Sequence, residues 1–403
     1  MKIPKFSHRE KWIFAGCFFC YMLCYTGRMN LGPVLGAIQD EIAVSSAHMG
    51  LIQTVFAAIY AIGQLLNGSL ADRTDPRRHI TTGLILSALC NLLFGLCRSY
   101  GQMLVCWGLN GIAQSMLWTS VVRVIVISFD KQQRSFVNLA MCVCFTLGHL
   151  LAWAVSGLLA AVVSWRGCFF VPAGLMALTA IFAFCTLPGQ KTAPVPEAAH
   201  TVSMRIPELL SDYRIWLIFL ACVTTGFGRD GVMTWAPKLI SEAGETKIAA
   251  AASSLLIPLL NMTGILLAQA LLRSRHGNIR SAIRLLLAAA AACCISIAAV
   301  PSVSGPVLAL LLGMMCSLMY SSSSLLNVML PMEYAHTGRA ALIAGVCDCM
   351  FYLGAALVSV VSGALLDSMG RAAMYLVWAA AAAVSCVLMI PSSERKSLKN
   401  HTG

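Results

Sequence analysis

Two arginines lie in the middle of apolar runs that are long enough to cross a bilayer. Arg28 lies in the run from Trp12 to Ile38, and Arg229 lies in a run that begins at Tyr213. A guanidinium group keeps its charge at physiological pH, and holding it at bilayer depth costs about 3 kcal/mol even on a lenient insertion scale. Its planar fork also matches the oxygens of a phosphate or carboxylate bidentately. Both arginines are therefore candidate binding residues for an anion.

The two arginines occupy matching positions in the two halves of the chain. Each follows a glycine, and each lies 16 residues after the aromatic residue that begins its apolar run. They are 201 residues apart, about half of the chain length. Basic loops also follow the second and the eighth apolar runs. These features predict two parallel repeats with a binding site at their interface.

A bridging anion is the electrostatically favourable occupant of such a site. Two cations about 10 Å apart repel by roughly 1.7 kcal/mol at an effective dielectric constant of about 20. An anionic oxygen about 4 Å from each cation gains roughly 4 kcal/mol per pair of charges before desolvation is subtracted. A dianion is the best fit. The alternative is a structural pair of cations, each neutralised by a carboxylate of its own half.

Three carboxylates inside the apolar runs are candidates for charge pairing or proton coupling. Asp230 is adjacent to Arg229 in sequence, and we expect it to point to a different side of the helix. Asp348 is able to reach Arg229 from the same half, either as its partner or as a proton carrier. Glu333 lies near the cytoplasmic end of its run, and no comparable carboxylate is available to Arg28.

Two further polar residues inside the runs have open interpretations. His149 is either a proton-linked substrate ligand or a hydrogen-bonded packing residue. Arg123 lies near the cytoplasmic end of its run, where it snorkels, joins a gate or contacts the substrate. The 17 cysteines are scattered, and no C-x-x-C pair faces another at zinc spacing, so we predict no metal site. The lack of a Gly-rich phosphate loop and of a readable nucleophile–base pair predicts no cofactor and no enzyme activity.

The composition places most of the chain in lipid. Of the 403 residues, 59% are hydrophobic and 11% are charged, and the mean hydropathy is +0.79. Each long apolar run can cross about 30 Å of hydrocarbon, where only helices satisfy their backbone groups within one segment. We predict an all-α membrane protein with twelve transmembrane helices in two six-helix halves. The predicted spans are 12–38, 47–70, 79–97, 101–128, 136–163, 167–187, 213–236, 247–272, 282–300, 304–331, 338–366 and 370–391.

The distribution of basic residues predicts the topology. If both termini are cytoplasmic, 20 of the 28 Lys and Arg residues lie in cytoplasmic segments, 5 lie on the opposite side and 3 lie within spans. This bias follows the positive-inside rule, and it is not the footprint of a nucleic-acid partner. The predicted halves are 1–187 and 213–391, joined by a linker at 188–212 and followed by a short tail at 392–403. We expect the first span to be retained, because no small-x-small cleavage site follows it.

Three sequence strings carry a specific resemblance. They are Tyr21-x-x-x-Tyr25-x-x-Arg28-x-Asn30, Gly228-Arg229-x-Gly231-x-x-x-Trp235-x-Pro237 and Gly111-x-x-Gln114-x-x-x-Trp118-x-x-x-x-Arg123. Together they resemble the organophosphate:phosphate antiporters, the glycerol-3-phosphate and hexose-phosphate carriers of the major facilitator superfamily. The resemblance implies that the two in-span arginines hold a phosphoryl group. It also implies that Tyr21, Tyr25 and Tyr60 line the path as hydroxyl donors.

The loop from Gly68 to Arg78 resembles the superfamily signature between helices 2 and 3. That resemblance implies a gate in which the carboxylate of Asp72 and the guanidinium of Arg73 latch the two halves in one state. The signature indicates the transporter fold and carries no information about the substrate.

The sequence departs from that family at auxiliary positions. Phe145 stands where the resemblance leads us to expect a histidine, and His149 follows one turn later on the same face. Gln64 replaces an expected lysine, and Met29 and Asn261 replace a lysine and a glutamate that would pair. Gln64, His149 and Asn261 therefore join the predicted substrate-binding residues, while the substrate itself stays open.

We expect a secondary transporter of a small organic anion, phosphorylated and exchanged for inorganic phosphate, that works by alternating access. Two alternatives stay open: proton-coupled symport of an organic or sugar acid, and a non-transporting membrane sensor of a phosphorylated ligand. The expected partners are the anion and the lipid bilayer, with no nucleic acid. We expect the protein to function as a monomer. We also expect it in the plasma membrane of a bacterium, because no N-x-Ser/Thr glycosylation site falls in a predicted outside loop.

Overall fold

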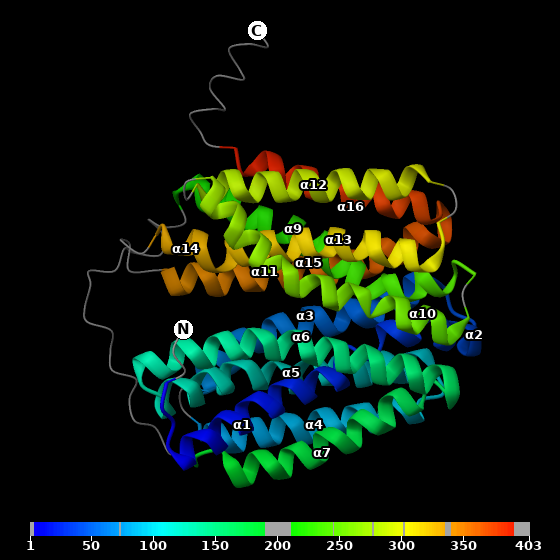
Figure 1. Cartoon of the computed structure of the whole chain (residues 1–403). Helices are drawn as coiled ribbons and strands as arrows, with labels where there is room; N and C mark the ends of the chain where they lie inside the picture. Colours follow the sequence, from blue (N-terminus) through cyan, green and yellow to red (C-terminus); the bar gives the residue numbers. More distant parts are fainter. Residues whose placement is uncertain are drawn as a thin grey trace.

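A computed structural model describes residues 4–390 except for 72–73, 190–210, 245, 276–277, 301–302 and 335–339. All regular elements in this described part are helices. Figure 1 shows that they form two groups. The N-terminal group consists of α1 to α7, and the C-terminal group consists of α9 to α16. The predicted all-α class is confirmed.

The elements of the N-terminal group are α1 (His8–Cys24), η1 (Tyr25–Gly27), η2 (Gly32–Val34), α2 (Leu35–Ile42), α3 (Ser46–Ala71), α4 (Pro76–Leu96), α5 (Tyr100–Ser128), α6 (Lys131–Val162) and α7 (Gly167–Thr186). Those of the C-terminal group are α9 (Tyr213–Ser241), α10 (Lys247–Ser254), α11 (Leu256–Ser274), α12 (Ile279–Ala299), α13 (Gly305–Ser324), η3 (Leu325–Met329), α14 (Leu330–Met332), α15 (Ala340–Ser368) and α16 (Arg371–Leu388).

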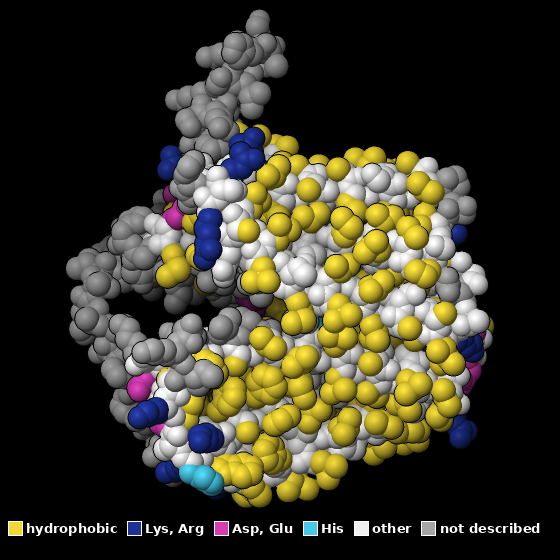
Figure 2. Space-filling model, viewed as in Figure 1, with side chains coloured by type: hydrophobic (Ala, Val, Ile, Leu, Met, Phe, Trp, Pro, Cys, Tyr) yellow, Lys and Arg dark blue, Asp and Glu magenta, His cyan; other side chains and the backbone are white. Residues whose placement is uncertain are grey.

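Eleven helices of the described part are long and apolar enough to cross a membrane. They coincide with the second to twelfth predicted spans, with α10 and α11 counted as one stretch and α13 to α14 as another. Figure 2 shows hydrophobic side chains over the sides of the molecule and charged side chains towards its two ends. This pattern is the one expected for a helix bundle in lipid.

The first predicted span, 12–38, is helical only in part. Helix α1 ends at Cys24, and two short 3-10 turns precede α2. Gly32 and Pro33 open the second turn; glycine lowers helix propensity and proline removes a backbone donor. Arg28 follows the first turn, with backbone angles of φ −121° and ψ −39° outside the helical range. The break therefore lies at the buried charge.

Helix boundaries elsewhere follow local capping chemistry. The hydroxyl of Ser7 and the carboxylate of Glu10 form a capping box at the start of α1. Asp75 caps α4, which begins at Pro76, and Asp130 caps α6. These side chains satisfy backbone N–H groups that have no partner within the helix. The polar caps therefore define where the apolar helices begin.

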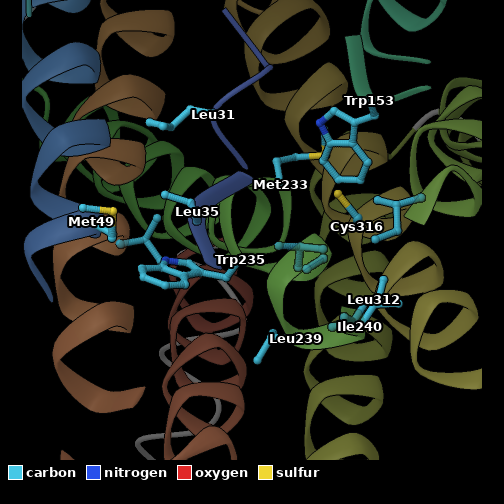
Figure 3. Packing of buried hydrophobic residues seen from close by; sticks show 14 of the residues in the cluster. Leu31, Leu35, Met49, Trp153, Met233, Trp235, Leu239, Ile240, Leu312 and Cys316 are labelled. Atoms are coloured by element: carbon cyan, nitrogen blue, oxygen red, sulfur yellow. The ribbon is translucent and has the colours of Figure 1, made fainter. Parts of the chain in front are cut away.

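One hydrophobic core joins the two groups. It includes Leu31 and Leu35 from the first span, Met49 from α3 and Trp235 and Leu239 from α9, all buried. Figure 3 shows these side chains near one another, with Trp153 and Cys316 on the other side of α9.

Cys316 belongs to α13, so this core brings helices from both groups into contact.

Polar contacts close the gap between the groups at the end that carries α2 and α10. The carboxylate of Asp367, on α15, accepts hydrogen bonds from the backbone N–H groups of Ser46 (3.0 Å) and Ala47 (2.8 Å) at the start of α3. Lys238, on α9, donates to the side chains of Gln39 and Ser46. At the opposite end Figure 2 shows a hollow between the two groups.

Close approach of α3 and α15 depends on glycines. A methyl group added at Gly50 would overlap the backbone carbonyl oxygen of Ser359, and one added at Gly363 would overlap that of Ser46. Small residues of this kind let helix backbones approach closely in lipid. The glycines therefore permit the two groups to meet at this end.

We predict that Gly50→Ala lowers the midpoint of thermal unfolding in detergent. The methyl group must displace backbone in α15, and overpacking of this kind costs about 1–3 kcal/mol. Gly174→Ala, on α7, is the matched control, because nothing lies within 4 Å of its added methyl group. Alanine there is expected to be neutral or stabilising. Equal midpoints for the two variants would contradict the close-approach argument.

Candidate functional site

A cavity of about 670 Å³ lies between the two groups of helices. Its walls come from α1, α3, α5 and α6 on one side and from α9, α13 and α15 on the other. The predicted site residues on its wall are Tyr21, Tyr25, Arg28, Tyr60, Gln64, His149, Arg229, Asp230 and Asp348. Met29 and Phe145 also line it. The structure thus brings together most of the predicted site.

Arg28 is buried and is held by hydroxyl groups from both groups of helices. Its side chain donates from Nη1 to the Tyr60 hydroxyl (3.1 Å) and from Nη2 to the Tyr352 hydroxyl (2.6 Å). The guanidinium carbon lies 4.2 Å from the centre of the Tyr60 ring. Only 4% of the residue is exposed, and Nε has no hydrogen-bond partner. Within the described residues, no ion pair joins Arg28 to a carboxylate.

The Tyr60 hydroxyl is positioned to donate a hydrogen bond onwards. It accepts hydrogen bonds from Arg28 and from Nε2 of Gln64 (3.0 Å). A hydroxyl has two lone pairs and one hydrogen, so these two bonds leave its proton free. All three residues line the cavity. A ligand oxygen there can therefore receive hydrogen bonds from the hydroxyl as well as from the guanidinium.

Arg229 is paired with its neighbour in sequence. Its Nη2 lies 2.6 Å and its Nε 3.1 Å from one carboxylate oxygen of Asp230. The expectation that Asp230 points to a different side of the helix is wrong, because the long arginine side chain folds back to reach the carboxylate. The rings of Tyr320 and Phe351 each lie 5.0 Å from the guanidinium carbon. The two arginines are therefore not equivalent.

Asp348 places a second carboxylate on the cavity wall. It lies one helical turn before Tyr352 on α15, and that tyrosine contacts Arg28. The described residues show no ion pair between Asp348 and Arg229, whose guanidinium contacts Asp230 instead. Two guanidinium groups and two carboxyl groups are the charged groups of the wall. With both carboxylates ionised, their formal charges cancel.

His149 lies on α6 with one ring nitrogen committed and the other without a partner. Nδ1 lies 2.9 Å from the carbonyl oxygen of Phe145, and the ring centre lies 4.5 Å from that of Tyr25. Nε2 is buried and makes no hydrogen bond. Because a carbonyl only accepts, Nδ1 donates, and Nε2 is left as the acceptor of a neutral imidazole. His149 is thus a packing residue that also offers an open nitrogen.

An aromatic wall completes the side of the cavity formed by the N-terminal group. The ring of Tyr21 lies 4.9 Å from that of Trp118, 5.1 Å from that of Phe145 and 5.5 Å from that of Tyr25. Phe145 therefore fills a packing position, which is consistent with its replacement of a polar residue. These rings exclude water from one side of the site and leave the polar groups clustered around the arginines.

The structure leaves other predicted residues away from the cavity wall. Asn261, on α11, contacts Met233 through Nδ2 and Sδ at 3.7 Å. Glu333 lies just after α14 and pairs with Arg280 at 3.7 Å. Arg123 is buried in α5 at 7% exposure but is not on the wall. The predicted gate residues Asp72 and Arg73 lie outside the described residues.

Tyr352 is the functional candidate that sequence reasoning missed. Its hydroxyl is the contact of Arg28 from the C-terminal group, and its ring lies 4.6 Å from that of Tyr60. The sequence did contain a signal for this tyrosine. It lies four residues after Asp348, a predicted site residue, and residues four apart share a helix face. The partner across the interface is visible only in the folded structure.

Residues 17–358 match the Major Facilitator Superfamily, so the chain belongs to this superfamily. The glycerol-3-phosphate transporter of Bacillus subtilis is 27% identical over 256 residues, 57% of this chain and 57% of that protein. A probable hexose phosphate transport protein of Chlamydia muridarum is 26% identical over 160 residues, 40% of this chain and 35% of that protein. The alignments therefore span 35% to 57% of these two curated relatives.

Solved structures support the same fold. The nucleoside transporter NupG superposes with a TM-score of 0.75 over 94% of this chain and 98% of its own, at 16% sequence identity. The resemblance to the organophosphate carriers is confirmed by the named relatives, which are transporters. The protein is a multi-pass membrane protein, and several of its relatives are bacterial.

We predict that Asp230→Asn lowers the unfolding midpoint and increases the stabilisation by added inorganic phosphate. Removing one partner of this partly buried ion pair costs about 1–3 kcal/mol, and the released Arg229 guanidinium becomes available to an anion. Differential scanning fluorimetry in detergent, with and without phosphate, measures both effects. Glu242→Gln is the matched control, because that carboxylate pairs with Lys238 at the closed end (3.7 Å). A phosphate response equal to that of the unmodified protein would contradict the prediction.

Proposed function

We propose that the protein is a secondary active transporter of a small phosphorylated organic anion, working by alternating access. The substrate would bind between Arg28 and Arg229 in the central cavity, which lies between the two groups of helices. Tyr21, Tyr25 and Tyr60 would contribute from the wall. Membership of the superfamily and the names of the relatives support this function. No step of the proposal needs a cofactor.

The observation that carries the proposal is the state of Arg28. A permanent charge is buried at 4% exposure, its hydrogen bonds within the described part of the chain go to neutral hydroxyls, and its Nε makes none. A buried charge without a counter-charge is costly. A bound anion would provide that counter-charge, and a phosphoryl group offers enough oxygens to accept several of these donors.

Arg229 would contribute the groups that Asp230 does not use. A guanidinium has five N–H donors, and the aspartate contacts Nε and Nη2. Nη1 therefore remains available on a side chain that lines the cavity. Arg229 would assist binding, but Asp230 already compensates part of its charge. Arg28 would therefore contribute most of the electrostatic attraction for an anion.

We propose that the membrane architecture consists of twelve spans in two six-helix halves with both termini in the cytoplasm. The interrupted first segment would be one span, and the eleven helices already described would bring the number to twelve. The halves would cover 1–187 and 213–391, with a cytoplasmic linker at 188–212 and a tail at 392–403. The contacts of Asp367 and Lys238 would then close the outer side. The structure would correspond to an inward-facing state of a carrier acting as a monomer.

We propose exchange as the coupling mode. The empty carrier retains Arg28 without an ion-pair partner, so closing the open end of the cavity over it would be unfavourable. A bound anion would remove this penalty and permit the switch. Proton-coupled symport is the second candidate, and the position of Asp348 on the cavity wall favours it. In that mode protonation of the carboxylate would accompany binding of the anion.

We predict that Arg28→Gln lowers counterflow at least 100-fold, since an interaction of about 3 kcal/mol or more is lost. Proteoliposomes loaded with labelled inorganic phosphate are diluted into phosphate esters, sugar acids or carboxylates, and release of label is followed. Arg166→Gln is the matched control, because that arginine pairs with Glu41 outside the central cavity (2.7 Å). Undiminished flux in the Arg28 variant would overturn the proposed site.

Asp348→Asn distinguishes the two coupling modes. If the protein is a proton symporter, the variant loses accumulation driven by a pH gradient and retains exchange, because an amide cannot carry the proton. If exchange is obligatory, the unmodified protein exchanges label rapidly and shows little net uptake. Both fluxes are measured in proteoliposomes with and without an inward proton gradient. Fast net uptake without a counter-substrate would contradict exchange.

A further inference from the structure

A second cavity, of about 590 Å³, lies away from the central site and shares no wall residue with it. It lies where α1 and α4 begin and α7 ends. His8, Arg9 and Trp12 contribute from α1, Arg77 contributes from α4, and the chain after α7 contributes up to Gly189. The proposed transport function does not use this cavity.

Arg77 is held in place within this cavity. Its guanidinium carbon lies 4.5 Å from the centre of the Phe184 ring. Gly189 packs against the same group so closely that an added methyl carbon would lie 2.5 Å from the guanidinium. The Nε atom is buried without a hydrogen-bond partner. The surrounding chain therefore fixes the guanidinium and leaves at least one donor unused.

Among the residues that the structure describes, the wall of this cavity contains cations and no carboxylate. Arg9 and Arg77 are the fixed charges on this wall. Two described acidic residues nearby in sequence, Glu10 and Asp75, have other partners. Glu10 accepts from the backbone of Ser7 at the helix cap (2.7 Å), and Asp75 caps α4 by accepting from the backbone N–H of Arg77 (2.9 Å). An anion entering the cavity therefore meets uncompensated positive charge.

An apolar surface continues from the cavity along the lipid-facing side of the bundle. Trp12 is half exposed, and Leu178, Ile181 and Phe184 expose 48–66% of their surface on one face of α7. Because they are spaced three residues apart, Leu178, Ile181 and Phe184 form an apolar strip along one face of α7. Figure 2 shows basic side chains next to hydrophobic ones at the corner of the molecule where α1 begins. A charged head and apolar chains would both find complementary surface there.

We propose that this second cavity binds the headgroup of an anionic phospholipid, with its acyl chains lying against α7. Basic pockets between transmembrane helices at the cytoplasmic surface recognise anionic headgroups, and interfacial tryptophan favours the same depth. A free phosphate would satisfy the arginines but would leave the adjoining apolar strip without a role. The lipid is therefore the ligand that uses both features.

The test measures retention of phosphatidylglycerol by the purified full-length protein, using native mass spectrometry over a lipid titration. We expect saturable binding of phosphatidylglycerol and much weaker binding of phosphatidylethanolamine. The double variant Arg9→Gln/Arg77→Gln is expected to lose roughly 25-fold in affinity, about fivefold for each basic residue. Arg78→Gln is the matched control, because its side chain is 79% exposed and does not line the cavity.

The single variant Arg9→Gln tests the same prediction if replacement of Arg77 disturbs folding. Arg9 is exposed on the first turn of α1, so this variant keeps the fold and is expected to lose about fivefold in lipid affinity. Unchanged affinity in the folded variants, or equal binding of phosphatidylethanolamine, would overturn the proposal. Displacement of the lipid by millimolar inorganic phosphate would assign the cavity to a soluble anion instead. None of these outcomes depends on Arg28 or on transport.

Discussion

The burial of a permanent positive charge at Arg28 is the constraint on which the central site depends. Hydroxyl groups from α3 and α15 hold the guanidinium, so the two groups of helices meet around it. Neutral hydroxyls orient a cation but do not neutralise it. The chain accommodates the charge by breaking the first apolar segment at this point and by surrounding the side chain with aromatic rings. The guanidinium is thereby held in a fixed position on the cavity wall, which is the basis of the proposal that an anion binds there.

The two arginines have matching places in the sequence but different electrostatic environments. Arg229 has a carboxylate within 2.6 Å, whereas Arg28 has tyrosine hydroxyls. With Asp348 also on the wall, the formal charges of the cavity cancel when both carboxylates are ionised. A ligand must therefore compete with internal carboxylates or accompany a change in their protonation. Matching positions in the sequence thus coexist with an asymmetric site.

The contacts between the helix groups are concentrated at one end. There, glycines allow α3 and α15 to touch, and a carboxylate of one group binds backbone N–H groups of the other. These polar contacts lie beside the hydrophobic core that joins the two groups, so this end of the interface combines both kinds of contact. The same architecture that closes this end leaves the central cavity accessible between the groups. A stable bundle and a reversible interface are therefore compatible within one chain.

The sequence by itself determined the helical class, the lipid environment and the two arginines inside apolar runs, because apolar length and an in-span charge are properties of local segments. It also placed Tyr60, Gln64 and His149 on the cavity wall. Only the tertiary structure decided that Tyr352 contacts Arg28, that Asp230 folds against Arg229 and that Asn261 lies off the wall. Side-chain direction and contacts between distant helices depend on packing, which no single segment encodes.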